Sequence, residues 1–154
     1  MIAVLQRVDR AAVRAEGELT GEIGRGLLIL LGVAKGDNEA DAAVLAKKVA
    51  ACRIFTDEAD KMNLSVRDVS GGALVISNFT LLADYTHGNR PSYFDAAPPE
   101  EASRLYLYFM ELMKRELGEV AGGRFGADMS IEMTANGPVT IVMDSRVLQK
   151  KERG

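Results

Sequence analysis

Two short segments hold most of the polar groups that could act on a small molecule. Ser77-Asn78-Phe79-Thr80 follows the apolar run 73–76, and Asn136-Gly137-Pro138 lies between two stretches of alternating apolar and polar residues. Hydroxyl, amide and backbone N–H groups at the point where a strand leaves a sheet could line a pocket and stabilise an oxyanion. Taken alone, the first segment is more simply explained as polar residues that end a strand and cap the next turn.

The second segment is unusual for a hairpin. Asn-Gly between the alternating stretches 129–134 and 139–143 predicts two paired strands, with the residue after glycine donating its N–H to close the turn. That residue is Pro138, which has no N–H group. A simple two-residue hairpin therefore cannot close, and the Gly137-Pro138 step leaves two carbonyl groups exposed at the end of a sheet. Taken alone, this segment is an open turn with an edge proline.

The composition excludes much conventional catalysis. The 154 residues contain one histidine and one cysteine, so one chain cannot form the usual Cys/His zinc sites. Catalysis of the Ser–His or Cys–His kind would need His87, which lies in the polar loop 83–98 and is expected to be solvated. Cys52 lies on the apolar stripe of a predicted helix and is expected to be a buried structural thiol. We therefore expect neither a metal nor a cofactor.

Charge and hydropathy indicate the compartment and exclude some partners. With 19 basic and 22 acidic residues the net charge is −3, which argues against an autonomous DNA-binding protein. The longest apolar run, residues 27–33, is far too short to cross a bilayer, and Arg7 comes too early for a signal peptide. A single cysteine fits a reducing compartment. We expect a cytoplasmic protein without a membrane partner.

The remaining pattern predicts the elements that position these segments. Residues 1–33 read as strands, and residues 73–76 as a further buried strand. Asn38 can cap a helix over residues 38–52, and Pro98-Pro99 can open a second helix that ends near Leu117. We expect one mixed α/β domain over residues 1–145, followed by a polar, basic and mobile tail over residues 146–154.

The two polar segments together resemble the D-aminoacyl-tRNA deacylases, also described as the D-tyrosyl-tRNA(Tyr) deacylase family. The similar blocks keep their order along nearly the whole chain, and together they are highly specific. The resemblance implies a largely antiparallel, barrel-like β-sheet with two main helices. The blocks include residues 4–8, 21–24, 26–28, 31–33, 53–55, 61–66, 77–81, 90–92, 96–100, 123–129 and 136–140.

The resemblance also implies a function. Members are homodimers, with active sites at the subunit interface, and cleave the ester that joins a D-amino acid to the 3′-terminal adenosine of tRNA. Gly137-Pro138 would be cis and enter the partner's pocket, where its carbonyls exclude L side chains, with Met129 and Asn136 among the substrate-binding residues. Exclusion by shape leaves achiral glycine acceptable, so glycyl-tRNA mischarged on tRNA(Ala) is a further expected substrate.

The resemblance places Ser77, Asn78, Phe79 and Thr80 on the catalytic wall. Backbone groups near Phe79 would stabilise the oxyanion, and Thr80 is a possible nucleophile. We favour a positioned water assisted by the terminal ribose hydroxyl, because an aminoacyl ester is already activated. Basic residues that could contact the tRNA are Arg7, Arg146, Lys150, Lys151 and Arg153.

Two departures leave alternatives open. Asn78 and Ala135 stand where family members usually carry Gln and Asn. One alternative is the related group with a trans Gly-Pro, which edits misplaced L-alanine. Others are a binding module for the tRNA end without catalysis, and a dimeric structural protein.

Overall fold

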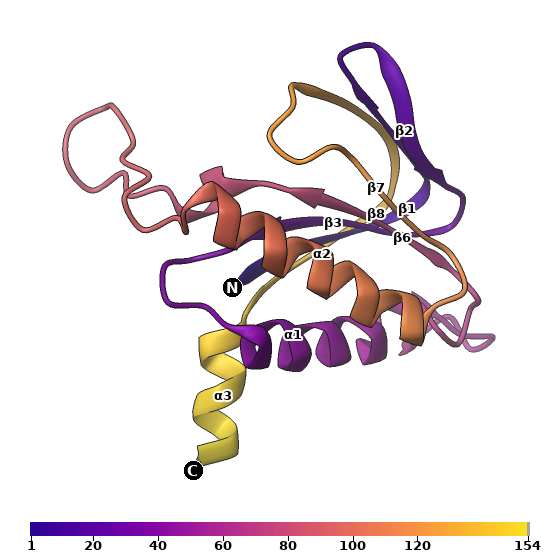
Figure 1. Cartoon of the computed structure of the whole chain (residues 1–154). Coiled ribbons are helices and arrows are strands. Elements are labelled where there is room, and N and C mark those ends of the chain that lie inside the picture. Colours follow the sequence, from indigo (N-terminus) through magenta and orange to yellow (C-terminus); the bar gives the residue numbers. More distant parts are fainter. Residues whose placement is uncertain (154) are drawn as a thin grey trace.

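A six-stranded mixed sheet forms the centre of the molecule (Figure 1). The computed structural model describes residues 1–153, without the side chains of residues 152–153. The strands follow the order β2-β1-β3-β6-β7, and β8 pairs with β1 on its other side. Their bounds are β1 Ile2–Ala15, β2 Glu18–Ile23, β3 Gly26–Gly32, β6 Gly72–Ser77, β7 Val120–Gly122 and β8 Met129–Asp144.

The sheet nearly closes on itself. Strand β1 pairs antiparallel with β2, β3 and β8, whereas β3–β6 and β6–β7 are parallel. The two ends of the strand order come together at Gly21 and Gly122, where a Cβ on Gly21 would lie 2.7 Å from the Gly122 carbonyl oxygen. The expected barrel-like, largely antiparallel sheet is confirmed. A second, two-stranded sheet consists of β4 (Phe55–Thr56) and β5 (Met62–Leu64).

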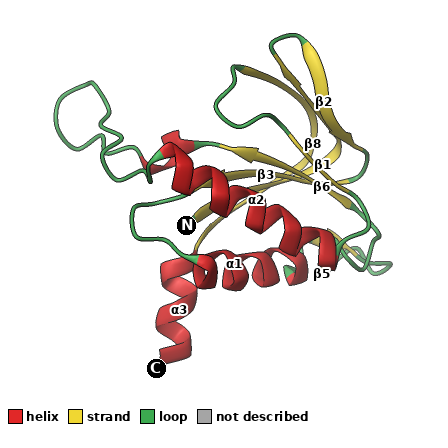
Figure 2. Ribbon diagram, viewed as in Figure 1, coloured by secondary structure: helices red, strands yellow, loops and turns green. Residues whose placement is uncertain are grey.

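Two helices cover one face of the sheet, side by side (Figure 2). Helix α1 spans Glu39–Ala51, and its capping box is formed by Asn38, which accepts from Ala40 and Asp41, and by Asp41, whose carboxylate accepts from the Asn38 N–H. Helix α2 spans Pro99–Glu116, with proline in its first turn. Both agree with the helices predicted over residues 38–52 and 98–117.

The apolar core has two parts. The larger part lies between the helices and the sheet and includes Leu45 and Phe109, whereas the smaller part lines the other sheet face around Val13 and Leu74. Tyr106 of α2 crosses to the sheet, where its hydroxyl donates to the Val75 carbonyl over 2.8 Å. Burial raises the pKa of Tyr106 to about 12. This bond fixes α2 against the strand that leads to Ser77.

The predicted C-terminal hairpin is wrong. Residues 129–134 and 139–143 belong to one strand, β8, which runs along β1 for its whole length. The pairing skips from Val8↔Ala135 to Gln6↔Thr140, so the four residues 136–139 bulge out opposite Arg7. Because Pro138 cannot close a tight turn, the chain continues in the same direction and β1 supplies the backbone partners on both sides of the bulge.

The segment expected as a polar tail over residues 146–154 is helical as far as the structure describes it, because Ser145–Arg153 form helix α3, and Gly154 lies outside the described residues. The first residue of α3 is buried: the Ser145 hydroxyl donates to an Asp41 carboxylate oxygen over 2.8 Å, and the Met1 amino group donates to that hydroxyl. Gln149 donates to the same Asp41 oxygen over 3.0 Å. These contacts order the segment against α1. Within residues 1–153, no helix combines the length and apolar character needed to cross a membrane.

Candidate active site

A cavity of about 710 Å³ opens beside the carboxyl end of β6. Four segments meet there: the end of β3, the Ser77–Phe79 turn, the loop that leads into α2, and the segment that enters β8. Its lining residues are Val33, Lys35, Ser77, Asn78, Phe79, Tyr93, Phe94, Ala96, Ala97, Pro98, Pro99, Ala102, Phe125, Gly126, Ala127, Asp128 and Met129.

The turn after β6 is held close to β3. The backbone N–H of Asn78 donates to the Leu31 carbonyl over 2.8 Å, and the chain then forms a short 3-10 helix, η1, over Phe79–Leu82. Gly32 makes this approach possible, because a Cβ there would lie 2.7 Å from Leu82 Cδ2 and 3.1 Å from the Asn78 carbonyl oxygen. The missing side chain at position 32 therefore lets the polar turn pack directly on the sheet.

The side chain of Asn78 is engaged within the turn. The Thr80 hydroxyl donates to Asn78 Oδ1 over 2.5 Å, and Asn78 makes no side-chain cap bond to η1. The first N–H groups of a helix have no acceptor inside it. The backbone N–H groups at the start of η1 therefore have no acceptor within that helix, and Phe79, its first residue, lines the cavity.

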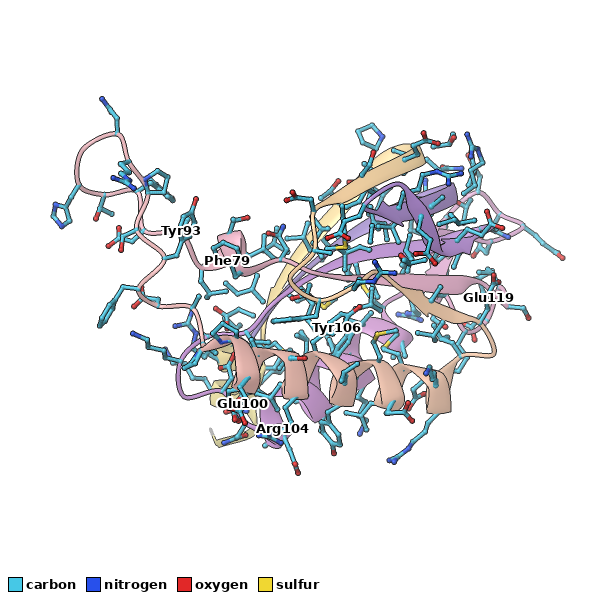
Figure 3. All side chains as sticks on the ribbon, turned by 45° about the horizontal axis from the view of Figure 1, so that its top comes forward. Phe79, Tyr93, Glu100, Arg104, Tyr106 and Glu119 are labelled. Carbon is cyan, nitrogen blue, oxygen red and sulfur yellow. The ribbon has the colours of Figure 1, made fainter. Side chains whose placement is uncertain are left out.

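Aromatic side chains form the rim of the cavity. The rings of Phe79 and Tyr93 meet edge to face with centroids 5.1 Å apart, at the base of the projecting loop in Figure 3. The Lys35 ammonium lies 3.3 Å from the centroid of Phe94, whose side chain is 74% exposed. The Lys35 backbone N–H also donates to the Asp95 carbonyl over 2.9 Å. The rim is therefore apolar and carries one cation.

The cavity brings together only some of the predicted site residues. Ser77, Asn78, Phe79 and Met129 line it. Thr80 comes directly after them but is not among the lining residues, and its hydroxyl turns to Asn78. Asn136, Gly137 and Pro138 lie on the bulge of β8, outside this chain's own cavity, and the Gly137–Pro138 peptide is cis.

The side chains of Arg7 and Asp9 in β1 form hydrogen bonds with Asn136 of the bulge. Arg7 donates to both the carbonyl oxygen and the side-chain Oδ1 of Asn136, and to the Ile54 carbonyl over 2.8 Å. Asn136 donates in turn to an Asp9 carboxylate oxygen over 2.8 Å. Gly137 has a φ of +135°, a conformation that favours glycine. The next residue, Pro138, is exposed at the tip.

The two residues that could have carried conventional chemistry lie elsewhere. His87 is exposed on the loop, and Cys52 is half-buried, with burial raising the pKa of its thiol. The exposure of His87 agrees with the expectation, whereas Cys52, expected to be buried, is half-buried at the end of α1, and neither residue lines the cavity. No group of three or more His, Cys, Asp or Glu side chains able to hold a metal occurs in the described part of the chain.

Sequence reasoning missed several residues of the cavity as site residues. Lys35 and the aromatic pair Tyr93-Phe94 received no role, although two adjacent aromatics in an otherwise polar loop are a signal for a binding surface. Asp128 was noticed only as part of a family block. Asp128 lines the cavity because the chain there enters β8, and the predicted hairpin gave this strand the wrong pairing partner.

Solved structures share the fold of this chain. The chain is similar to a c-Myc DNA Unwinding Element Binding Protein, with a TM-score of 0.88, 36% identity, and coverage of 94% of this chain and 98% of that one. It also shares its fold with a probable eukaryotic D-amino acid tRNA deacylase, at a TM-score of 0.79 and 14% identity over 93% of this chain and 98% of that one.

The sequence relatives are more specific. Residues 4–144 match the family model described as D-Tyr-tRNA(Tyr) deacylase. The chain is 54% identical to a D-aminoacyl-tRNA deacylase of Anaeromyxobacter dehalogenans, over 96% of this chain and 99% of that protein. It is 53% identical to a D-aminoacyl-tRNA deacylase of Geobacter metallireducens, over 94% and 96%. The chain belongs to the D-Tyr-tRNA(Tyr) deacylase family, which is a family of hydrolases.

Proposed function

We propose that this protein hydrolyses the ester of D-aminoacyl-tRNA to a free D-amino acid and tRNA. The observation that carries the proposal is the cavity at the end of β6, in which Ser77, Asn78 and Phe79 face the segment that ends in Met129. Its volume of about 710 Å³ suits a nucleoside ester. Family membership supports the same reaction.

The mechanism needs little side-chain chemistry. An aminoacyl ester is activated, so a positioned water and stabilisation of the oxyanion supply most of the acceleration. The backbone N–H groups at the start of η1 are suited to the oxyanion, and the ribose hydroxyl of the substrate assists the water. Thr80 fits this scheme as a positioning residue, since its hydroxyl donates to Asn78 and no histidine lies in the cavity lining.

Rejection of L-amino acids is assigned to Gly137 and Pro138 of a second subunit. Both residues project from β8 on an exposed bulge that lies outside their own chain's cavity, so they are available to another chain. Strand β8 also exposes apolar side chains, including Ile131, Met133 and Val142, which suit a homodimer interface. The projecting carbonyls would exclude an L side chain and leave room for D side chains and for glycine.

The two departures from the family pattern fit this scheme. Asn78 is one methylene shorter than glutamine, and its Oδ1 is already bonded to Thr80. Ala135 lacks an amide, but the neighbouring Asn136 supplies amide contacts to Arg7 and Asp9. The local contacts that support the turn and the bulge are therefore present despite both departures.

The partner is the aminoacyl end of tRNA rather than a long nucleic acid. A net charge of −3 limits the number of phosphate contacts, so binding should be weak and sensitive to salt. One relative's name gives DNA as the ligand of that protein. For this chain, we place the reaction in the cytoplasm and propose no DNA substrate.

The deciding experiment compares four substrates with the purified protein. Hydrolysis of D-Tyr-tRNA and of Gly-tRNA(Ala), with L-Tyr-tRNA left intact, is expected. Hydrolysis of L-Ala-tRNA instead would identify the related L-alanine-editing activity. Hydrolysis of no aminoacyl-tRNA would overturn the proposal and leave a binding module.

A further inference from the structure

The contact between Lys35 and Phe94 has no role in the reaction described above. Lys35 follows β3, Phe94 lies in the loop before α2, and both line the cavity at its rim. The ammonium stands 3.3 Å from the ring centroid, and the backbone bond from Lys35 to Asp95 holds the two segments together. The ammonium therefore occupies a defined position at the opening although its side chain is exposed.

The surroundings leave this charge available. Lys35 is the only cation among the residues that line the cavity, which otherwise hold one carboxylate, Asp128. Among the described residues, none of the ion pairs includes Lys35. Asp144, for example, pairs with Arg146 over 2.8 Å. A contact with an aromatic face is weak at an exposed site, and it leaves the N–H donors of the ammonium free for an anion.

The chemistry of the proposed substrate indicates which anion Lys35 would bind. An aminoacyl ester and its terminal adenosine carry no negative charge, so the first negative group met outside the cavity is the phosphodiester on the 5′ side of that adenosine. Resting on the proposed function, we infer that Lys35 binds this phosphate and that Phe94 positions the ammonium for it. The site then contacts the substrate at the ester, inside the cavity, and at the first phosphate, at the rim.

Three D-tyrosyl esters test this assignment: the ester of adenosine, the ester of adenosine 5′-monophosphate, and D-Tyr-tRNA. The variant is Lys35→Met, which keeps an apolar chain of similar length against Phe94. A charge-assisted hydrogen bond at a partly exposed site predicts a loss of about tenfold in kcat/KM on the two phosphorylated substrates. The adenosine ester should lose less than twofold. Lys47→Met removes an exposed lysine of α1 outside the cavity and is the matched control.

Salt dependence provides a second readout. The slope of log kcat/KM for D-Tyr-tRNA against log salt should become shallower by about 0.7 in Lys35→Met, as expected for one lost contact to a single strand. Lys47→Met should keep the wild-type slope.

Phe94 is tested as a positioning residue. Phe94→Leu removes the ring face and should raise KM for D-Tyr-tRNA a few-fold with kcat unchanged. In the Lys35→Met background the same substitution should not raise KM further, because Phe94 acts only by positioning the Lys35 ammonium. Independent, multiplicative losses would overturn the assignment of Phe94.

The outcomes separate the two levels of inference. Equal losses of Lys35→Met on all three esters, or no loss on any of them, would overturn phosphate binding by Lys35 while the deacylase reaction stands. If the wild-type protein hydrolyses none of the D-tyrosyl esters, the proposed function itself is overturned, and the role of Lys35 with it.

Discussion

Arg7 and Asn136 meet at two pairs of atoms although they lie 129 positions apart in the chain. Arg7 Nε donates to the Asn136 carbonyl oxygen over 3.1 Å, and Arg7 Nη2 donates to Asn136 Oδ1 over 2.9 Å. A planar guanidinium can make both contacts at once, whereas an ammonium cannot reproduce that geometry. Arg7 is thus one of the side chains of the facing strand that orient the bulge, together with Asp9.

We expect Arg7→Lys to weaken discrimination more than stability. The bulge would lose one of its fixed points, so the ratio of kcat/KM for D-Tyr-tRNA to that for L-Tyr-tRNA should fall about tenfold. The measurement is hydrolysis of both substrates alongside a thermal unfolding curve. Arg10→Lys changes an exposed arginine of the same strand and should leave the ratio unchanged. Identical behaviour of the two variants would contradict this role for Arg7.

Thr80→Ala should retain measurable activity. Its hydroxyl donates to Asn78, so its loss frees that side chain and should lower kcat less than about tenfold, whereas loss of a nucleophile costs several orders of magnitude. The check is single-turnover hydrolysis of D-Tyr-tRNA, with Thr80→Ser as the variant that keeps the hydrogen bond. Complete loss of hydrolysis in a folded, substrate-binding Thr80→Ala protein would make Thr80 the nucleophile.

Gly26→Ala should destabilise the sheet strongly. A Cβ at position 26 would lie 2.0 Å from the Gly72 carbonyl oxygen across the β3–β6 pair, and backbone cannot move aside as a side-chain end can. We expect the free energy of unfolding in urea to fall by about 3 kcal/mol. Gly24→Ala, two residues earlier, meets no atom within 4 Å and should change it by less than about 1 kcal/mol. Equal stabilities of the two variants would refute the close approach.

Tyr106 makes the stability of the fold dependent on alkaline pH. Burial raises the pKa of its phenol from 10.0 to about 12, so the unfolded chain loses its proton first. Stability from this group is complete below pH 10 and falls as the pH rises from 10 towards 12. The expected loss is about 1.4 kcal/mol by pH 11.

The measurement for Tyr106 is urea unfolding at several pH values between 8 and 11. Tyr106→Phe should be about 1 kcal/mol less stable at pH 8, because the bond to the Val75 carbonyl is lost. Its stability should decline less above pH 10 than that of the wild-type protein. Parallel curves for both proteins would show that Tyr106 does not cause the decline.

Local signals predicted the elements well wherever the decisive contacts were local. Asn38 caps α1 through residues two and three positions later, and Pro99 starts α2, so neighbouring residues determine both helix starts. The hairpin at Asn136 was wrong because the true partner of β8 is β1, more than 100 residues away. The position of α3 likewise depends on the hydrogen bond between the buried Ser145 and Asp41, which no local sequence pattern reveals.

The sequence indicated which polar residues could form the candidate site, but not which other residues line its cavity. Ser77, Asn78 and Phe79 follow a buried strand, which made a pocket wall possible, and the family resemblance then placed them on the catalytic wall. Lys35 and Phe94 come from separate loops, and the hydrogen bond from the Lys35 N–H to the Asp95 carbonyl brings the two loops together at the rim. Such a rim depends on tertiary contacts, so the sequence shows its parts without their arrangement.

The long pairing of β1 with β8 has a consequence for how the chain acquires its structure during synthesis. Strand β1 is synthesised before its hydrogen-bonding partner on one side, residues 129–144 of β8, which follow more than 100 residues later. Until those residues leave the ribosome, that edge of β1 stays open, and a nascent chain with an open apolar strand edge is prone to pair with other chains. Completion of the sheet is therefore expected to wait for the synthesis of β8, with its pairing to β1 as a late step.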